Sequence, residues 1–382
     1  MDSPSIALRY IQGRVLLLSL IPLGLMFAIT VTLTRTYHAR VAELAREWFQ
    51  KGNDDLSAGK PADALEDFRN ALSYDPENNL VQLRLAEALL AGGRLPEANS
   101  YFLNLWDRTP GSGEVNLNLA RTSARMGDAE QAIRHYQAAI YGNWETAPSQ
   151  QRRSTRLELC KFLLENGRLD DARAELAGLA ADTPPEEAIL HAQMGYLFLK
   201  ATDPAQAVVE FEAALRSNPK QSQWLEDAGK AAYATGNYQK AETYLSQANR
   251  ENPSRSIGEL LETVRDILRN DPYLPGLSDE EQTRRSWRAL QQGLMRLRTC
   301  MEMNPARQSP QPSLELQVLA KNAKDLQGHV NLRSLGRDSD MRNGVMRLVF
   351  QIEDETSRVC AAPSGPDQAL LLIGKEHQGS VQ

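Results

Sequence analysis

Several residue types and patterns that mark catalytic or nucleic-acid-binding proteins are scarce in this sequence. Its 382 residues include three cysteines, five histidines and only 6% aromatic residues. Three cysteines are too few for the disulfide framework of a small secreted scaffold. The 43 basic and 49 acidic residues give a net charge of −6, whereas a nucleic-acid-binding domain carries a basic excess or a basic stripe. A chain of this length has room for two or three domains.

Recognisable catalytic and metal-binding motifs are absent as well. The sequence contains no HExxH motif, no Walker phosphate-binding loop and no GxSxG nucleophile elbow. The five histidines are dispersed, and none lies with a cysteine at metal-ligand spacing. We therefore expect no enzyme activity, no catalytic residue, no metal site, no cofactor and no small-molecule substrate.

One long apolar run stands near the N-terminus. Residues Val15–Leu33 are 19 residues without a charge, close to the roughly 20 that a helix needs to cross the hydrocarbon core of a bilayer. Arg14 and Arg35 flank the run, as charged residues do at membrane interfaces. The sequence thus predicts an N-terminal tail at 1–14 and a transmembrane helix at 15–34.

Two other interpretations of this run are weaker. A cleaved signal peptide has a shorter apolar stretch followed by small residues, whereas Tyr37 and His38 follow here. A buried helix of a globular domain seldom holds 19 uncharged residues in a row. Basic residues lie on both sides of the run, and long domains translocate largely regardless of charge. We expect a single-pass protein of the bacterial inner membrane, with its body in the periplasm rather than the cytoplasm.

A repeat with a period near 34 residues follows the apolar run. Small, aromatic and proline positions recur in the same order, and the steps between successive starts are 34, 34, 40, 35 and 34 residues. The six repeats are 45–78, 79–112, 113–152, 153–187, 188–221 and 222–255. Such a period is typical of helical repeat arrays.

Each repeat reads as two antiparallel helices. Small residues at the eighth and twentieth positions let two helices approach closely, and a large apolar residue four positions later fills the gap. A glycine between the helices supplies the turn, and a proline near position 32 ends the second helix. The first repeat shows the whole pattern with Trp48, Gly52, Gly59, Ala64, Phe68, Ala71 and Pro76.

These residues resemble the signature of the tetratricopeptide repeat family. The resemblance covers 45–255 and identifies the chain as an N-terminally membrane-anchored bacterial member. It implies an all-α fold: a right-handed superhelical solenoid of antiparallel helix pairs, each packed only against its neighbours. Members of this family generally bind a protein or peptide in the concave groove that the first helices line.

The resemblance places a set of polar residues in this groove. The expected binding residues are Asn53, Arg84, Glu87, Asn118, Arg121, Arg125, Glu158, Lys161, Gln193, Tyr196, Lys200, Asp227 and Lys230. The alternative is that they are ordinary solvated helix positions. One subfamily holds terminal carboxylates with a lysine four residues before an asparagine. Phe49 stands at that distance before Asn53, so we predict no such clamp.

The region after the repeats is expected to be helical. An amphipathic segment at 256–270 predicts a capping helix, and the proline-rich residues 271–277 predict a linker. Residues 278–382 form a small, mainly helical C-terminal domain. Leu314–Leu326 reads as a helix, and Met341–Glu353 as a helix or a strand.

Two groups of residues in the C-terminal domain allow alternative interpretations. Five arginines form either an anionic-lipid patch or, as we favour, a solvated face: Arg284, Arg285, Arg288, Arg296 and Arg298. Cys300 and Cys360 either pair in an oxidising compartment or remain buried thiols, the second being favoured because spacing says nothing of distance. Cys160 occupies the small-residue position of the fourth repeat, where we expect it to be part of the core.

From the resemblance we expect a non-enzymatic, membrane-tethered scaffold or adaptor that binds a partner protein or peptide in its groove, in the assembly of an envelope or membrane complex. The lipid bilayer is a second partner, through residues 15–34, and no nucleic acid is expected. Two alternatives stay open. One is a periplasmic chaperone for secreted clients. The other is a membrane-anchored regulator of lipopolysaccharide-type envelope assembly, although its pair of CxxC knuckles is missing here.

Overall fold

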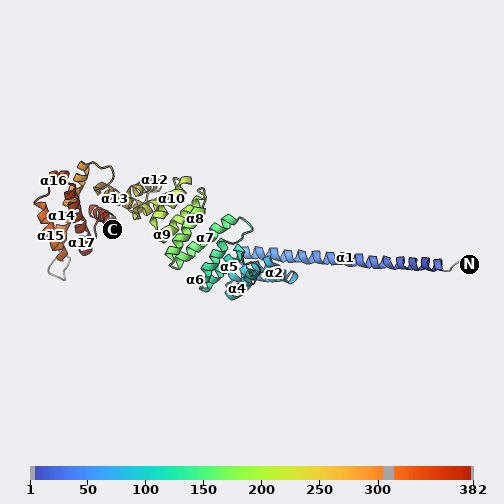
Figure 1. Ribbon diagram of the computed structural model, residues 1–382. Helices are drawn as coiled ribbons and strands as arrows, with labels where there is room; N and C mark the ends of the chain where they lie inside the picture. The colour runs from blue at the N-terminus through green and yellow to red at the C-terminus, as the bar shows by residue number, and fades with distance from the viewer. Residues whose placement is uncertain (1–4, 304–313, 380–382) are drawn as a thin grey trace. The chain divides into compact units, whose positions relative to one another are not determined.

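The computed structural model describes residues 5–303 and 314–379 of the chain, and the side chains of 22–302 and 314–377. Eighteen helices make up the secondary structure of these ranges, together with one isolated bridge (Figure 1). The helices fall into two compact units, Met1–Phe162 and Leu163–Gln382, called here the N-terminal and the C-terminal unit. The division lies inside the first helix of the fourth repeat.

The N-terminal unit consists of a long first helix and the helices of the first repeats. Consecutive helices pack against each other from α1 to α6, as the repeat pattern predicts. Their bounds are α1 Ser5–Ser57, α2 Pro61–Tyr74, α3 Asn79–Ala91, α4 Leu95–Arg108, α5 Gly113–Met126, α6 Ala129–Ile140 and α7 Pro148–Glu165, the last of which crosses into the C-terminal unit.

The C-terminal unit contains the remaining repeats and the C-terminal helical domain. Its repeat helices are α8 Leu169–Asp182, α9 Ala188–Lys200, α10 Pro204–Ser217, α11 Ser222–Ala234, α12 Tyr238–Glu251 and α13 Arg255–Asn270. The domain after them is formed by α14 Asp279–Met303, α15 Leu314–Gln327, α16 Leu332–Arg337, α17 Ser339–Val359 and α18 Pro366–Gly379. The expected all-α repeat array is therefore confirmed.

Glycines of the first helices lie directly against large side chains of the second helices. A Cβ atom added at Gly52 in α1 would lie 2.6 Å from the Phe68 ring of α2. The same construction at Gly195 in α9 places the Cβ 2.8 Å from the ring of Phe211 in α10. Both rings are completely buried. The predicted close approach at the eighth position of the repeat is thus confirmed, and only glycine fits it in these two pairs.

The turns within the repeats have the predicted glycines. Gly59, Gly93 and Gly127 adopt φ angles of 72°, 77° and 83°, in the left-handed region that glycine enters without steric cost. The fifth repeat differs, because Thr202 takes this place with φ 58°.

The long connection that follows α6 in the third repeat is held by hydrogen bonds and packs against the start of α5. Asn143 exchanges two backbone hydrogen bonds with residues 111 and 113, at 2.8 and 2.9 Å. The indole of Trp144 donates to the carbonyl oxygen of Ala139 at 2.9 Å. A Cβ atom at Gly113 would lie 2.3 Å from the Trp144 ring. Gly113 therefore has a packing role in addition to the turn that the sequence suggests.

The capping helix expected at 256–270 corresponds to α13. It contacts α12, and its residues Ile257, Leu261 and Val264 are buried. It also contacts α18 and α14, so α13 joins the repeats to the C-terminal domain. The alternative left open for Met341–Glu353 is decided, because this segment belongs to the helix α17.

The C-terminal domain is built around α14 and α17. Its core contains Leu297 of α14, Leu316 and Leu319 of α15, and Ile352 of α17. Cys300 and Cys360 are bonded as a disulfide, with their Cα atoms 5.9 Å apart. The interpretation of two free thiols is therefore wrong, because helix packing brings together cysteines that lie 60 residues apart in the sequence. Cys160 is buried and takes no part in a disulfide, as expected for a core position.

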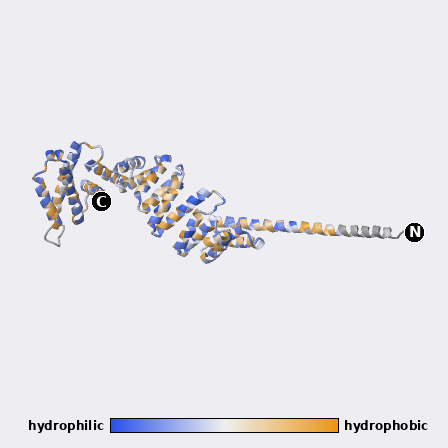
Figure 2. Ribbon diagram, viewed as in Figure 1, coloured by the Kyte–Doolittle hydropathy of each residue, from blue (hydrophilic) through white to orange (hydrophobic). Residues whose placement is uncertain are grey.

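The transmembrane helix expected at 15–34 falls within the N-terminal helix α1. Among the residues whose side chains are described, no helix is long and apolar enough to cross a membrane. Residues 15–21 of the expected span lie outside this range. The described part of α1 is hydrophobic at first and hydrophilic further along (Figure 2), and the side chains of Met26 and Phe27 are exposed.

Changing Gly195 to alanine is expected to destabilise the repeats. The new Cβ would overlap the buried Phe211 ring, and such overpacking typically costs about 1–3 kcal/mol. The matched control is Gly258→Ala in α13, where nothing lies within 4 Å of the Cβ position. This control is expected to gain up to about 1 kcal/mol from helix propensity. Urea unfolding followed by circular dichroism measures both variants. Equal midpoints for the two would contradict the close approach.

Candidate functional site

The polar residues predicted for the groove form a hydrogen-bonded chain across α3 and α5 of the N-terminal unit. Arg84 donates to one carboxylate oxygen of Glu87 at 2.6 Å, and Asn118 donates to the other at 2.9 Å. A second carboxylate, that of Glu114, lies 3.7 Å from Arg84. The Asn118 side chain is buried. This part of the predicted set is therefore held in one arrangement by its own contacts.

The next residues on the same face join α5 to α7. Arg121 donates two hydrogen bonds to Glu158, at 2.8 and 2.7 Å, and Tyr136 of α6 donates a third at 2.9 Å. Burial by itself would raise the pKa of Glu158. The hydrogen bonds from Arg121 and Tyr136 outweigh burial and hold the pKa below its ordinary value. Glu158 is thus an ionised carboxylate fixed in place.

The other predicted residues of the N-terminal unit differ in exposure. The guanidinium of Arg125 donates to the backbone carbonyl of Leu90, so this cation connects α5 with α3. Asn53 is half-buried near the end of α1, and Lys161 of α7 is exposed. Lys161 and Arg125 are thus both exposed, and Asn53 is less so.

A second polar cluster lies between α9 and α11 in the C-terminal unit. The hydroxyl of Tyr196 donates to Asp227 at 2.6 Å, and Gln223 donates to the same oxygen at 3.0 Å. Burial and the neighbouring Asp227 raise the pKa of Tyr196. Lys230 pairs with Glu226 at 2.6 Å. The structure thus brings Tyr196 and Asp227 together, as predicted for one face.

Two further predicted residues of this unit, Gln193 and Lys200 of α9, are exposed. Sequence reasoning missed Tyr136, Gln223 and Glu226 as members of these clusters. Gln223 lies four residues before Asp227 on the same helical face, so the helical period would have found it. Tyr136 lies on a second helix, where no pattern of the first helices points to it.

The five arginines of the C-terminal domain do not form one surface. Arg285 donates to the carbonyl oxygens of Leu268 and Asp271, at 2.7 and 2.9 Å. Arg296 is also largely buried, and its Nε lies 3.1 Å from Glu353. The predicted solvated face therefore fails for these two arginines, which join α14 to α13 and to α17. Arg284, Arg288 and Arg298 are exposed, as predicted.

The carboxylate that lies beside Arg296 is buried. Glu353 is fully buried, and burial together with the neighbouring Asp367 raises its pKa to about 8 despite Arg296. Arg296 also donates to Thr356 at 2.8 Å and to Asp367 at 3.3 Å. The arrangement ties α14, α17 and α18 together. Within the described residues no group of three or more potential metal ligands is found.

Comparison with known proteins identifies the repeats. The model of the tetratricopeptide repeat matches residues 49–113 and 193–256. These two segments, about a third of the chain, are similar to tetratricopeptide repeats. The matched segments include the close glycine–ring pairs of α1 with α2 and of α9 with α10.

Two curated proteins share such repeats with this chain. The TPR repeat-containing thioredoxin TTL4 of Arabidopsis thaliana is 30% identical over 130 residues, which are 34% of this chain and 19% of that protein. The tetratricopeptide repeat and J domain-containing co-chaperone DNJ1 of Fusarium oxysporum is 34% identical over 86 residues, 22% of this chain and 16% of that protein. The chain thus spans less than a fifth of the length of either relative.

Solved structures also match parts of the chain. PilW, a type IV pilus biogenesis factor, matches 57% of this chain and 98% of its own, with 21% identity and a TM-score of 0.40. The tetratricopeptide fold is typically non-enzymatic, although one relative is named a thioredoxin. The cysteines of this chain stand at 160, 300 and 360, so no CxxC pair is present.

Replacing Glu158 with glutamine is expected to weaken the repeats at neutral pH by about 1 kcal/mol or less, because the ion pair with Arg121 is partly exposed. The folded pKa of Glu158 is lowered. Its stabilisation is therefore present above the unfolded pKa of about 4.3 and is lost as the pH falls through the folded pKa. The difference from the parent chain should shrink with decreasing pH.

Urea unfolding at pH 7 and at pH 3 measures this dependence. The matched control is Glu66→Gln, at an exposed position of α2, which should change little at either pH. A Glu158→Gln effect that is equally large at pH 3 would show that the ionised pair is not its cause.

Proposed function

We propose that this chain is a non-enzymatic scaffold whose first-helix polar faces bind an extended segment of a partner protein. The observation that carries the proposal is the ordered set of carboxylate, amide and guanidinium groups on these helices. Glu87, Asn118 and Arg121 already stand in hydrogen-bonded positions, so a partner does not have to order them when it binds. Such preorganisation lowers the entropic cost of binding.

This face holds both hydrogen-bond acceptors and donors, as an extended backbone requires. A peptide backbone offers both N–H and C=O groups. The exposed members of the set are Arg121, Arg125 and Lys161 in the N-terminal unit and Gln193, Lys200 and Lys230 in the C-terminal unit. We assign first contact with the partner to these exposed residues, and the more buried residues around them define the shape of the face.

A membrane tether for this scaffold is the second part of the proposal. The uncharged run Val15–Leu33 supports it, as do the exposed apolar side chains of Leu23, Met26 and Phe27 in α1. Tethering would raise the effective concentration of the polar faces toward membrane-bound partners. We propose that these partners belong to an envelope or membrane complex.

A periplasmic location for the body is supported by the disulfide between Cys300 and Cys360. Disulfides persist in oxidising compartments such as the bacterial periplasm and are rare in the cytosol. A chaperone for secreted clients would have the same location. It would bind many unfolded chains, whereas a scaffold binds one partner in a fixed ratio.

Photo-crosslinking in cells tests the polar faces. A photoreactive phenylalanine analogue at Lys161 or Gln193 is expected to give a discrete adduct with a partner protein. The control positions are Arg69 on α2 and Asn104 on α4, which are exposed on second helices, and they should give no adduct. Equal adducts from control and test positions would overturn the assignment. A smear of many adducts from the test positions only would favour the chaperone.

The proposed location predicts the state of the cysteines in cells. In denatured, unreduced extracts, a maleimide reagent of high mass should label one cysteine per chain, Cys160. It should label all three after reduction, because the other two are bonded. Protease added to spheroplasts should digest the body without lysis. Three labelled cysteines before reduction, or full protection from the protease, would place the body in the cytoplasm instead.

A further inference from the structure

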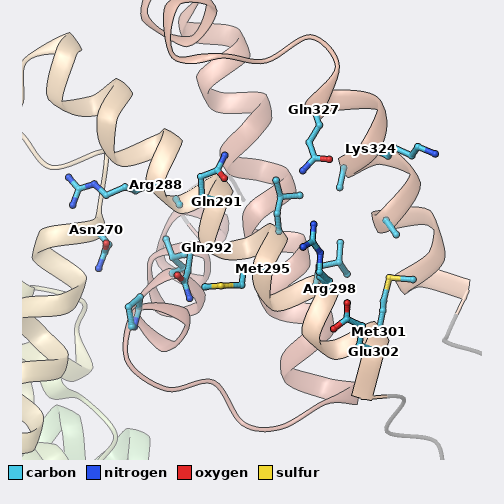
Figure 3. A pocket seen from close by; sticks show the side chains of 17 residues that line it. Asn270, Arg288, Gln291, Gln292, Met295, Arg298, Met301, Glu302, Lys324 and Gln327 are labelled. Atoms are coloured by element: carbon cyan, nitrogen blue, oxygen red, sulfur yellow. The ribbon is translucent and has the colours of Figure 1, made fainter.

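A groove of about 880 Å³ runs along α14 in the C-terminal unit (Figure 3). Ten of the fifteen α14 residues from Arg288 to Glu302 line it, so this helix borders the groove over about four turns. At 1.5 Å per residue this stretch is roughly 21 Å long. Residues 320–327 of α15 form one wall, and Pro366 and Leu370 at the start of α18 form the other.

The floor of the groove is apolar and adaptable. Leu294 and Met301 of α14 are only half-buried, and the side chain of Met295 is 57% exposed. Ala320 and Ala323 stand on the α15 wall, and such small residues let another element approach closely. Flexible methionines are typical of surfaces that adjust to a bound apolar face. A partly exposed apolar strip of this kind favours docking by another chain.

The rim of the groove is positively charged. Arg288, Arg298 and Lys324 stand on it against a single acidic residue, Glu302. Arg288 lies 3.6 Å from Glu281, whereas Arg298 and Lys324 are exposed residues of the lining. In Figure 3 their side chains lie on α14 and α15 respectively. This charge arrangement is complementary to an acidic partner.

We propose that this groove binds an acidic amphipathic helix of a partner protein. Four turns of α14 match a partner helix of about 15 residues, given 3.6 residues per turn. The apolar face of that helix would lie on Leu294, Met295 and Met301, and acidic residues on its flanks would face Arg298 and Lys324. The groove is a binding surface additional to the polar faces of the repeats and uses no residue of theirs.

The shape of the groove favours a helix over a lipid chain. A small-molecule pocket buries about 70–90% of its ligand, whereas this groove is a trough that follows one helix. An amphipathic helix needs such a trough, with apolar contacts every three to four residues. Glutamine side chains at 291, 292 and 327 border the trough and can hydrogen-bond the polar side of a bound helix.

Charge reversal tests the proposal directly. The probes are two designed 15-residue helical peptides with the same leucine face, one flanked by glutamates and one by lysines. We expect the full-length chain, held in nanodiscs of neutral lipid, to bind the glutamate peptide in fluorescence anisotropy. The double variant Arg298→Glu/Lys324→Glu should bind it about tenfold more weakly and should gain binding of the lysine peptide.

The matched control is Arg333→Glu/Lys375→Glu, which reverses two exposed cations outside the lining of the groove, and its affinity should equal that of the parent chain. Met295→Glu should also weaken binding of the glutamate peptide. Equal binding of both peptides by the parent chain would overturn the proposal. So would anionic vesicles that bind through Arg298 and Lys324 while neither peptide binds, because the surface would then recognise lipid. Loss of photo-crosslinks at the repeat faces would leave this result unaffected.

Discussion

The contact between a small residue on one helix and a large buried side chain on the next carries the architecture of the repeats. Gly52 against Phe68 and Gly195 against Phe211 leave no room for a Cβ atom. The helices of these pairs therefore lie as close as their backbones allow, which brings the aromatic ring into the interior. Because each repeat buries its apolar face only in its own pair and against its neighbours, a lost contact of this type affects the adjoining repeats as well.

Close packing of the apolar faces also determines where polar residues can lie. In α3 and α5 the side chains that face away from the pair include Glu87, Asn118 and Arg121, and they meet across neighbouring first helices. The carboxylate of Glu87 accepts a hydrogen bond from Asn118, and the guanidinium of Arg121 donates to Glu158. Each of these two charges thus has a polar partner within the chain. The polar residues of this face are therefore held in fixed positions by their own contacts.

The C-terminal domain uses a different means of stabilisation. Its helices are joined by the Cys300–Cys360 disulfide and by the buried Arg296, whose partners lie on α17 and α18. These bonds connect α14 to α17 and α18, and α14 also borders the groove. A rigid helix with an exposed apolar strip and a basic rim is suited to docking. The domain thus contributes a second surface, of a different chemical character from that of the repeats.

The sequence by itself determined the helices, their pairing and the turns. The helices α3, α5, α9 and α11 begin at 79, 113, 188 and 222, where the 34-residue period places the repeats. Periodicity, steric size and the φ preference of glycine act over a few residues, so they can be read without a structure. Only the tertiary structure decided that Arg121 pairs with Glu158, 37 residues away, that Arg296 is buried, and that the two distant cysteines are bonded. These contacts depend on distances between helices, which spacing along the chain does not fix.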